Sequence, residues 1–214
     1  MRKAFRARKC YDSLNRGTGA GILKLISQKR AREILDRDDE WIGVVCARYG
    51  VPPAIVKAIL FQEMTMIDLL DPVADAVVAS NLFGKKDSST GIGQIFGYVG
   101  LNAANFAVDN GLATYEALGI RSDHRLDPKN AKDVRLVWKK LRRNRHANIE
   151  LSTLNLASIA HEVTGGTRPD IAWDALTEDE LKLILTRYNA DVHYVTRYGE
   201  RAYNLYRAFD SGQA

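Results

Sequence analysis

Cysteine is scarce in this sequence, since its 214 residues include two, Cys10 and Cys46. Neither belongs to a CxxC or CxxH spacing, so the sequence indicates no disulfide framework and no cysteine-based zinc site. Cys46 lies in the apolar segment WIGVVCARY, where a free cysteine behaves as a small buried hydrophobe. We therefore expect neither a metal nor any other cofactor.

Long apolar runs are missing as well. No segment approaches the roughly 20 apolar residues that a helix needs to cross a bilayer. The basic N-terminus, MRKAFRARK, lacks the apolar centre of a secretory signal peptide. We therefore expect synthesis in the cytoplasm and no transmembrane segment. Any action beyond the cytoplasm then needs delivery by a secretion system, a phage or lysis.

Several common catalytic signatures are also absent. The chain has no glycine-rich phosphate loop ending in lysine and no GxSxG segment. The segment HEVTG at 161–165 starts like the HExxH motif of zinc proteases, but Gly165 stands where the second histidine belongs. These absences argue against nucleotide-binding, serine-hydrolase and zinc-protease chemistry.

Positive charge is in excess, with 31 Lys and Arg against 26 Asp and Glu, a net charge of +5 and a pI near 9.2. Such a balance favours polyanions, including nucleic acid, anionic lipid headgroups and an anionic cell wall. The charge gathers in segments 1–9 and 139–146, the second reading KKLRRNRH. A run of this kind is ordinarily the solvated face of a helix.

Alternating strand patterns are lacking, whereas apolar residues recur at helical spacing through most of the chain. The pattern predicts helices over 20–36, 41–49, 53–70, 73–82, 94–111, 130–146, 151–164, 181–190 and 192–209. Asp38 or Asp39 is expected to cap the second helix, and Thr177 with Glu180 forms a capping box. The expected fold is one all-α domain over 20–214, after a basic arm at 1–19, with at most a small hairpin around 82–92.

Two predicted helices have a clear inward face. In the helix at 130–146 the apolar stripe consists of Val134, Val137, Trp138 and Leu141. In the last helix the inward positions are Val195, Tyr198, Ala202 and Leu205.

One acidic residue lies on an apolar face. In the helix that starts at Pro53, steps of three and four place Glu63 in the stripe of Val56, Ile59, Leu60, Ile67 and Leu70. A carboxylate there is costly unless it is paired or protonated, and burial raises the pKa of a carboxyl group. This is how a general acid for glycosidic cleavage is made. The alternative is a structural ion pair between Glu63 and Lys57 or an arginine.

Two further segments follow this glutamate in a meaningful order. The ordered set FQE (61–63), GIGQI (91–95) and RYNA (187–190) resembles the lysozyme-like superfamily, in particular lytic transglycosylases and goose-type lysozymes. Those families have a glutamate on an apolar helix, a glycine-bounded segment with glutamine, and an aromatic-Asn-Ala segment before a final tyrosine-containing helix. The resemblance spans about residues 50–209 and implies a lysozyme-like fold with a saccharide groove.

The resemblance implies cleavage of the β-1,4 bond between N-acetylmuramic acid and N-acetylglucosamine in peptidoglycan, with Glu63 as the general acid. In the lytic route Glu63 also takes the proton of the muramoyl 6-hydroxyl, which gives a 1,6-anhydro product. In the hydrolytic route a second carboxylate usually positions a water, and Asp87 is the candidate. The alternative for Asp87 is an ordinary loop aspartate that makes a turn or a cap.

The same resemblance implies that sugar contacts come from the glycine segment and from RYNA: Ser89, Thr90, Gly91, Gly93, Gln94, Tyr188 and Asn189. The Gln94 amide suits an N-acetyl group, and the glycines allow backbone to approach a saccharide closely. Tyr188 would orient Glu63 or the sugar. The alternatives are a core aromatic at Tyr188 and a helix C-cap at Asn189.

Three residues depart from the family pattern. Met64 stands where classical lytic enzymes have a serine, Phe96 stands where goose-type enzymes have an aspartate, and Asp191 replaces the usual glycine after RYNA. We therefore expect a divergent branch of the superfamily.

Two other functions stay open. The first is a basic helical nucleic-acid-binding protein with a helix-turn-helix at 46–63, although its second helix has few polar residues that could read bases. The second is a catalytically inactive wall-binding relative. For the enzyme we expect action at the cell wall or in the periplasm as a phage lysis enzyme or an antibacterial effector. An effector implies an immunity protein as a partner. For the enzyme we expect no nucleic-acid partner.

Overall fold

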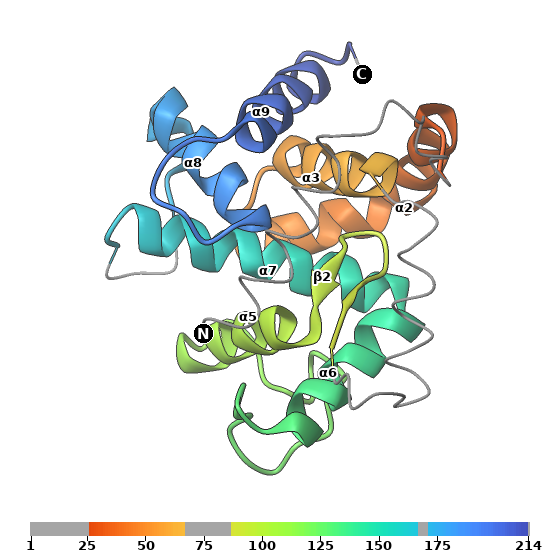
Figure 1. Cartoon of the computed structure of the whole chain (residues 1–214), viewed down its shortest axis with the longest axis vertical. Helices are drawn as coiled ribbons and strands as arrows, with labels where there is room; N and C mark the ends of the chain where they lie inside the picture. Colours follow the sequence, from red (N-terminus) through yellow and green to blue (C-terminus); the bar gives the residue numbers. More distant parts are fainter. Residues whose placement is uncertain (1–25, 67–86, 167–170, 214) are drawn as a thin grey trace, which may run out of the picture.

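The structure, a computed structural model, describes residues 26–66, 87–166 and 171–213. These residues form seven α-helices, a short 3-10 helix and one two-stranded hairpin (Figure 1). The elements in chain order are α2 (Gln28–Tyr49), α3 (Pro53–Met66), β1 (Ser89–Thr90), β2 (Ile95–Phe96), α5 (Gly97–Asp109), α6 (Ala131–Arg143), α7 (Arg145–Val163), η2 (Trp173–Ala175), α8 (Glu178–Asn189) and α9 (Arg197–Asp210). The prediction of a mostly helical fold with a small hairpin is confirmed.

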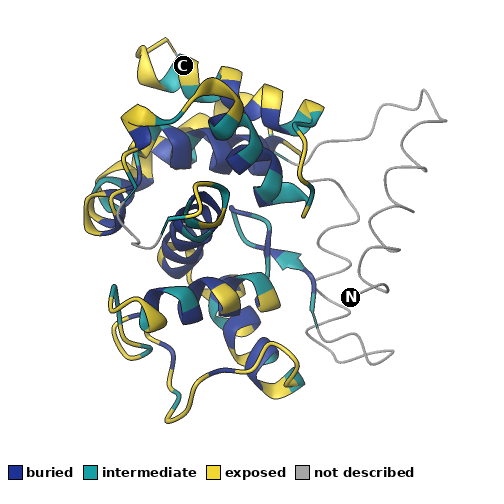
Figure 2. Ribbon diagram, turned by 90° about the vertical axis from the view of Figure 1, so that its left-hand side faces the viewer, coloured by how far each residue is buried: buried dark blue, intermediate teal, exposed yellow. Residues whose placement is uncertain are grey.

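Helix α7 lies at the centre of the molecule. It contacts α2, α3, α5, α6 and α8, with α2, α3, α8 and α9 above it and α5 and α6 below it in Figure 1. Residues 147–157 of α7 are all buried, and Figure 2 shows this helix dark blue between outer helices that carry exposed residues. A helix buried on every side belongs to the core, and one hydrophobic cluster joins all the helices around it.

Helix α2 corrects one prediction, because the expected break near Asp38 does not occur. The helix runs from the N-cap Ser27, whose Oγ accepts from Arg30 N at 3.2 Å, to Gly50 in the left-handed conformation. Asp38 is buried inside this helix, and its Oδ2 lies 2.7 Å from Arg145 Nε of α7. An aspartate costs little in mid-helix when a tertiary cation neutralises it, so a second cap is not needed.

Helix α3 begins at Pro53, as predicted. Almost all of its residues are buried, including Val56, Ile59 and Leu60 of the predicted stripe. Cys46, at the end of α2, is 2% exposed, and burial raises the pKa of its thiol to about 12, which confirms its core role. The end of the predicted helix beyond residue 66, the helix at 73–82, the basic arm 1–19 and Cys10 lie outside the described residues.

The hairpin lies slightly later in the chain than expected. Strands β1 and β2 pair antiparallel, with Ser89 opposite Phe96 and Thr90 opposite Ile95. The helix predicted from residue 94 therefore starts at Gly97 instead. The reason is local: Gln94 has a φ of 43°, a left-handed conformation that no right-handed helix accommodates, and the next two residues form β2.

The remaining helices follow the predicted pattern with shifted ends. The predicted stripe of α6 is buried, and Asn144 alone separates α6 from α7, its side chain accepting from Ala147 N at 3.0 Å. Helix α7 thus starts six residues before the predicted position of 151. Both halves of the Thr177–Glu180 capping box are present at α8. Helix α9 starts at Arg197 rather than at 192.

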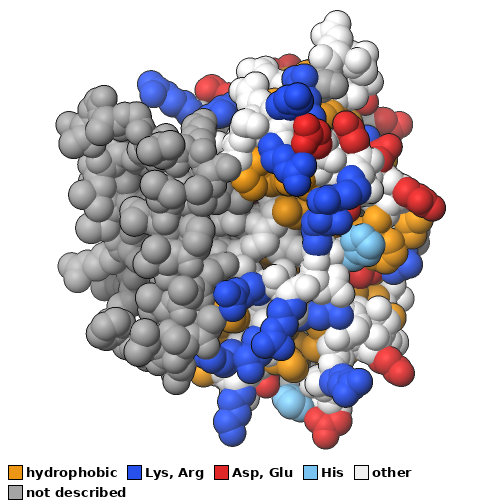
Figure 3. Space-filling model, turned by 90° about the vertical axis from the view of Figure 1, so that its right-hand side faces the viewer, with side chains coloured by type: hydrophobic (Ala, Val, Ile, Leu, Met, Phe, Trp, Pro, Cys, Tyr) orange, Lys and Arg blue, Asp and Glu red, His pale blue; other side chains and the backbone are white. Residues whose placement is uncertain are grey.

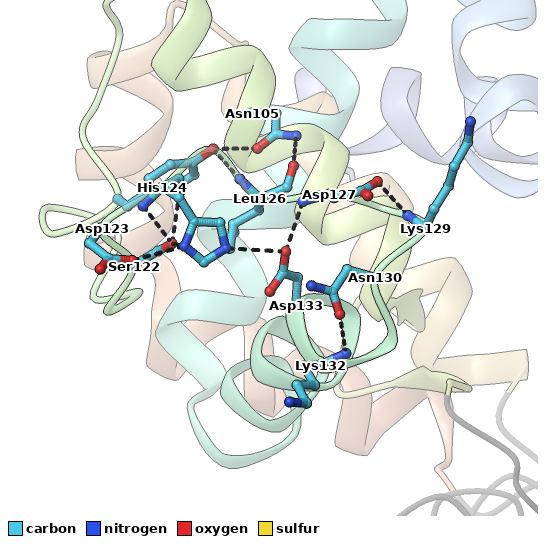
Figure 4. Close-up of polar contacts among 11 residues, drawn as sticks. Asn105, Ser122, Asp123, His124, Leu126, Asp127, Lys129, Asn130, Lys132 and Asp133 are labelled. Atoms are coloured by element: carbon cyan, nitrogen blue, oxygen red, sulfur yellow. Dashed lines mark hydrogen bonds and ion pairs between the residues drawn. The ribbon is translucent and has the colours of Figure 1, made fainter.

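The segment between α5 and α6 has no regular secondary structure and is held by side-chain contacts (Figure 4). Asn105 Nδ2 donates to the Leu126 carbonyl oxygen at 2.9 Å, and the Asp127 amide donates to Asp133 Oδ2 at 2.9 Å. His124 lies between Asp123 and Asp133. Within the described ranges, no helix is both long and apolar enough to cross a membrane.

Candidate active site

Glu63 is buried on α3, as the helical spacing predicted, with 8% of its surface exposed. The hydroxyl of Tyr198 on α9 donates a hydrogen bond to its Oε1 at 2.5 Å. Burial, and then the charge of Glu63, raises the pKa of Tyr198 well above its usual value of 10. The phenol therefore keeps its proton and acts as a fixed donor to the carboxyl group. The predicted cation, Lys57, is paired with Asp39 at 2.6 Å.

Two neighbouring contacts hold Tyr198 in place. Gln62 Nε2 donates to the Tyr198 carbonyl oxygen at 3.1 Å, so consecutive side chains of α3 bind one residue of α9. Gly199 packs against α8 so closely that a Cβ there would lie 2.0 Å from Thr186 Oγ1. Sequence reasoning placed Tyr198 in the core but assigned it no part in the site. Its only signal was an aromatic with a hydroxyl group on an inward face.

The glycine segment rests on the central helix α7. The Gly93 amide donates to Asn148 Oδ1 at 2.8 Å, and Asn148 Nδ2 donates to the Thr90 carbonyl oxygen at 3.0 Å. A Cβ at Gly91 would lie 2.2 Å from Asn148 Nδ2, and one at Gly93 would lie 2.2 Å from Ser152 Oγ. The glycines thus allow the turn to approach α7, while their close approach to a saccharide stays a prediction.

Tyr188 joins the two predicted motifs. Its hydroxyl donates to the Gly93 carbonyl oxygen at 2.8 Å and lies 3.0 Å from Ser152 Oγ. Helix α8, which carries Tyr188, packs against α9, which carries Tyr198. The Tyr188 hydroxyl thus belongs to the group of contacts that holds the glycine turn, while Tyr198 binds Glu63. Tyr188 is buried, so the core-aromatic alternative describes its ring, while its hydroxyl belongs to this group.

The other predicted sugar contacts lie at the hairpin and at the end of α8. Gln94 is half-buried, and its Nε2 donates to the Gly91 carbonyl oxygen at 2.8 Å, which closes the turn. Ser89 is half-buried and Thr90 is buried. Asn189 is half-buried as the last residue of α8, whose C-cap is the following alanine.

Asp87 caps a helix. Its Oδ1 accepts from the Gly97 amide at 2.7 Å and its Oδ2 accepts from the Tyr98 amide at 3.0 Å, at the start of α5. The N-cap position of α5 is Phe96, which has no side-chain acceptor, so Asp87 supplies the capping oxygens from ten residues upstream. The structure thus shows Asp87 as a helix cap, which is one of the alternatives that the sequence left open.

Asn155 is a polar residue that sequence reasoning missed. It follows Asn148 and Ser152 at steps of four and three, so all three share the face of α7 on which the glycine turn rests. It is 8% exposed. Its amide offers an acceptor and two donors on the face of α7 that carries the glycine turn, which makes Asn155 a candidate ligand contact. The sequence pattern that could have indicated this residue is the helical spacing of Asn148, Ser152 and Asn155 among the apolar residues of this segment.

Within the described residues, no group of three or more His, Cys, Asp and Glu side chains is placed to hold a metal ion. His161 of the HEVTG segment packs against the ring of Phe106 with a centroid distance of 5.6 Å. Comparisons with protein-family models, curated proteins and solved structures gave no match to this chain. The resemblance to lysozyme-like enzymes therefore rests on the three motifs themselves.

Proposed function

We propose that this protein is a peptidoglycan-degrading glycosidase that cleaves the β-1,4 bond between N-acetylmuramic acid and N-acetylglucosamine. One observation carries the proposal: the buried Glu63 accepts from Tyr198 of α9, and α9 packs against α8, whose Tyr188 binds the glycine turn. The helix of the acid, the GIGQI segment and the RYNA segment thus converge in space. Their order along the chain is the order that suggested the lysozyme-like superfamily.

Glu63 acts as the general acid in this proposal. Its proton passes to the glycosidic oxygen while the bond to the muramoyl C1 breaks and an oxocarbenium-like state develops. Tyr198 is a positioning residue in this proposal, because its hydroxyl binds the carboxyl group and orients it. A proton donor held in one orientation needs less reorganisation in the transition state.

The contacts of Asp87 support the lytic route. Both of its oxygens accept backbone amides of α5, so the described contacts of this carboxylate hold the start of a helix. In the lytic route the Glu63 carboxylate removes the proton of the muramoyl 6-hydroxyl as that oxygen attacks C1. This step forms the 1,6-anhydro ring, regenerates the protonated acid and needs no second carboxylate.

Polar groups of the hairpin and of α7 supply the sugar contacts in this proposal. The Gln94 amide closes its turn with one donor and retains its carbonyl oxygen for an N-acetyl group. Asn155 offers both an acceptor and two donors from the same face of α7. Ser89 and Thr90 of β1 and Asn189 at the end of α8 complete the proposed set.

The nucleic-acid alternative has less support. A helix-turn-helix at 46–63 needs an exposed second helix that enters the major groove. In this fold that helix is α3, in which every residue from 58 to 65 is buried. The enzyme we propose works at the cell wall as a phage lysis enzyme or an antibacterial effector. For an effector, an immunity protein that covers the site is the expected partner.

Purified peptidoglycan sacculi test the proposal. We expect the wild type to release soluble muropeptides with 1,6-anhydro ends, identified by mass spectrometry. Glu63→Gln should reduce release by about 10²- to 10⁴-fold, because an amide cannot donate the proton. Glu40→Gln, at an exposed position of α2, is the matched control.

No release by the wild type, or equal release by Glu63→Gln, would overturn the proposal. Reducing ends in place of anhydro ends would keep the glycosidase and overturn the lytic route.

A further inference from the structure

Helix α6 presents one strongly basic face. Its outward residues at steps of three and four are Lys132, Arg135, Lys139, Arg142 and Arg143, here called the basic face of α6. The only acidic residue of the helix, Asp133, is buried and accepts from the Asp127 amide. Figure 3 shows Lys and Arg side chains gathered low on this side of the molecule, where α6 lies, with few acidic side chains among them.

Most of this charge is uncompensated. By contrast, two arginines on other helices have carboxylate partners. Arg48 of α2 lies 2.9 Å from Glu150, and Arg145 of α7 lies 2.7 Å from Asp38. Within the described part of the chain, no carboxylate lies within ion-pair distance of Lys132, Lys139, Arg142 or Arg143. Like charges spaced three and four residues apart on a helix repel one another, and an anionic partner relieves that repulsion.

The basic face of α6 lies next to the hairpin. The guanidinium of Arg142 lies 5.5 Å from the centroid of the Trp138 ring. The indole N–H of Trp138 donates to Ser88 Oγ at 3.1 Å, and Ser88 immediately precedes β1. Helix α6 also contacts β1 directly. The charges therefore flank the hairpin whose turn belongs to the candidate site.

We propose that the basic face of α6 binds the carboxylates of the peptides that project from a peptidoglycan strand held at the hairpin. This inference rests on the proposed function. Every muramic acid can bear a peptide through its lactyl group, and these peptides carry free carboxylates at their ends and side chains. Guanidinium groups bind carboxylates through paired N–H donors, and ammonium groups add point charge. Each exposed contact is weak and salt-dependent, so the effect comes from several acting together.

The test compares two substrates that differ only in their peptides. One is intact sacculi free of phosphate-containing polymers, and the other is glycan strands from which an amidase has removed the peptides. The test variant is Lys139→Gln/Arg143→Gln, which leaves the packing of Arg142 on Trp138 intact. The matched control is Lys29→Gln/Arg37→Gln, which removes the same charges from exposed positions of α2.

We expect the test variant to lose roughly three- to tenfold in kcat/KM on intact sacculi at low salt. It should match the wild type on peptide-free strands, and the control should match the wild type on both. Retention on sacculi is measured in a Glu63→Gln background, so that this arm does not depend on turnover. There the two basic-face substitutions should weaken retention on sacculi and leave retention on peptide-free strands unchanged.

Equal losses on both substrates, or no loss on sacculi, would overturn the inference. A salt-sensitive shift of DNA that the same two substitutions abolish, without an effect on sacculi, would assign the face to nucleic acid instead. If the wild type cleaves neither substrate, the proposed function fails, and the retention arm still decides whether the basic face binds peptide carboxylates.

Discussion

The hydroxyl of Tyr198 on α9 donates to Oε1 of Glu63 on α3 at 2.5 Å, across 135 positions of sequence. The neighbouring Gln62 binds the main-chain carbonyl of the same tyrosine, so two consecutive residues of α3 fix one residue of α9. A buried carboxyl group needs a polar partner, and here the last helix supplies it. The orientation of the candidate acid thus depends on how α9 docks.

Tyr198→Phe removes the hydroxyl and keeps the ring. In the proposed enzyme we expect kcat to fall at least about tenfold with little change in KM, because the acid loses its orientation and the substrate contacts remain. The free energy of unfolding should fall by about 1–3 kcal/mol, since a buried carboxyl group loses a hydrogen bond. Muropeptide release across a pH series and chemical denaturation measure the two effects.

Tyr194→Phe, at a residue 67% exposed, controls for loss of a phenol hydroxyl. An unchanged kcat and an unchanged pH profile for Tyr198→Phe would show that the tyrosine does not position the acid.

Asp87→Ala removes the two acceptors at the start of α5. We expect the free energy of unfolding to fall by about 1 kcal/mol, as for other lost helix caps. Turnover should change no more than a few fold, and the products should keep their anhydro ends. Asp87→Asn, which retains one acceptor oxygen, should recover part of the stability. Loss of turnover in Asp87→Asn at unchanged stability would instead assign Asp87 to catalysis.

Asn155→Leu replaces the amide side chain of Asn155, a residue 8% exposed, by an apolar side chain of similar size. We expect the free energy of unfolding to change by less than about 1.5 kcal/mol, because the two side chains have similar volumes. The KM for glycan should rise if this amide binds sugar. Asn148→Leu is the contrasting variant, and it should lose about 1–3 kcal/mol because it leaves the Gly93 amide and the Thr90 carbonyl unpaired. An unchanged KM in a stable Asn155→Leu would exclude the sugar contact.

His124 gives the fold a pH-dependent contact. A hydrogen bond to Asp123, followed by one to Asp133, raises the pKa of this exposed histidine above 6.5 (Figure 4). The folded state therefore holds the proton to a higher pH than the unfolded state does. The stabilisation is complete below pH 6.5 and is lost as pH rises through the folded pKa.

An NMR titration of the His124 ring should give a midpoint above 6.5. Asp123→Asn should lower that midpoint. A wild-type midpoint at or below 6.5 would contradict the contact.

Local patterns in the sequence predicted much of the fold. Helix α3 starts at Pro53, and the Thr177–Glu180 pair forms the capping box of α8, both as predicted. The apolar spacing also placed Glu63 correctly on a buried face. These features depend on residues within one or two helical turns, so they can be read without the tertiary structure. The predicted break at Asp38 was wrong because its neutralising partner, Arg145, is far away in the sequence.

The tertiary structure alone decided how these pieces meet. By itself, the sequence determined that a carboxylate would lie on an apolar helix face and that glycines would form a turn. It did not determine that Tyr198 would reach Glu63, that Gly93 would rest on α7, or that Asp87 would cap α5. Those contacts depend on how close the helices pack and at what angle they cross. Packing distance and crossing angle follow from the fit of side chains across the whole core, not from the spacing within any one segment.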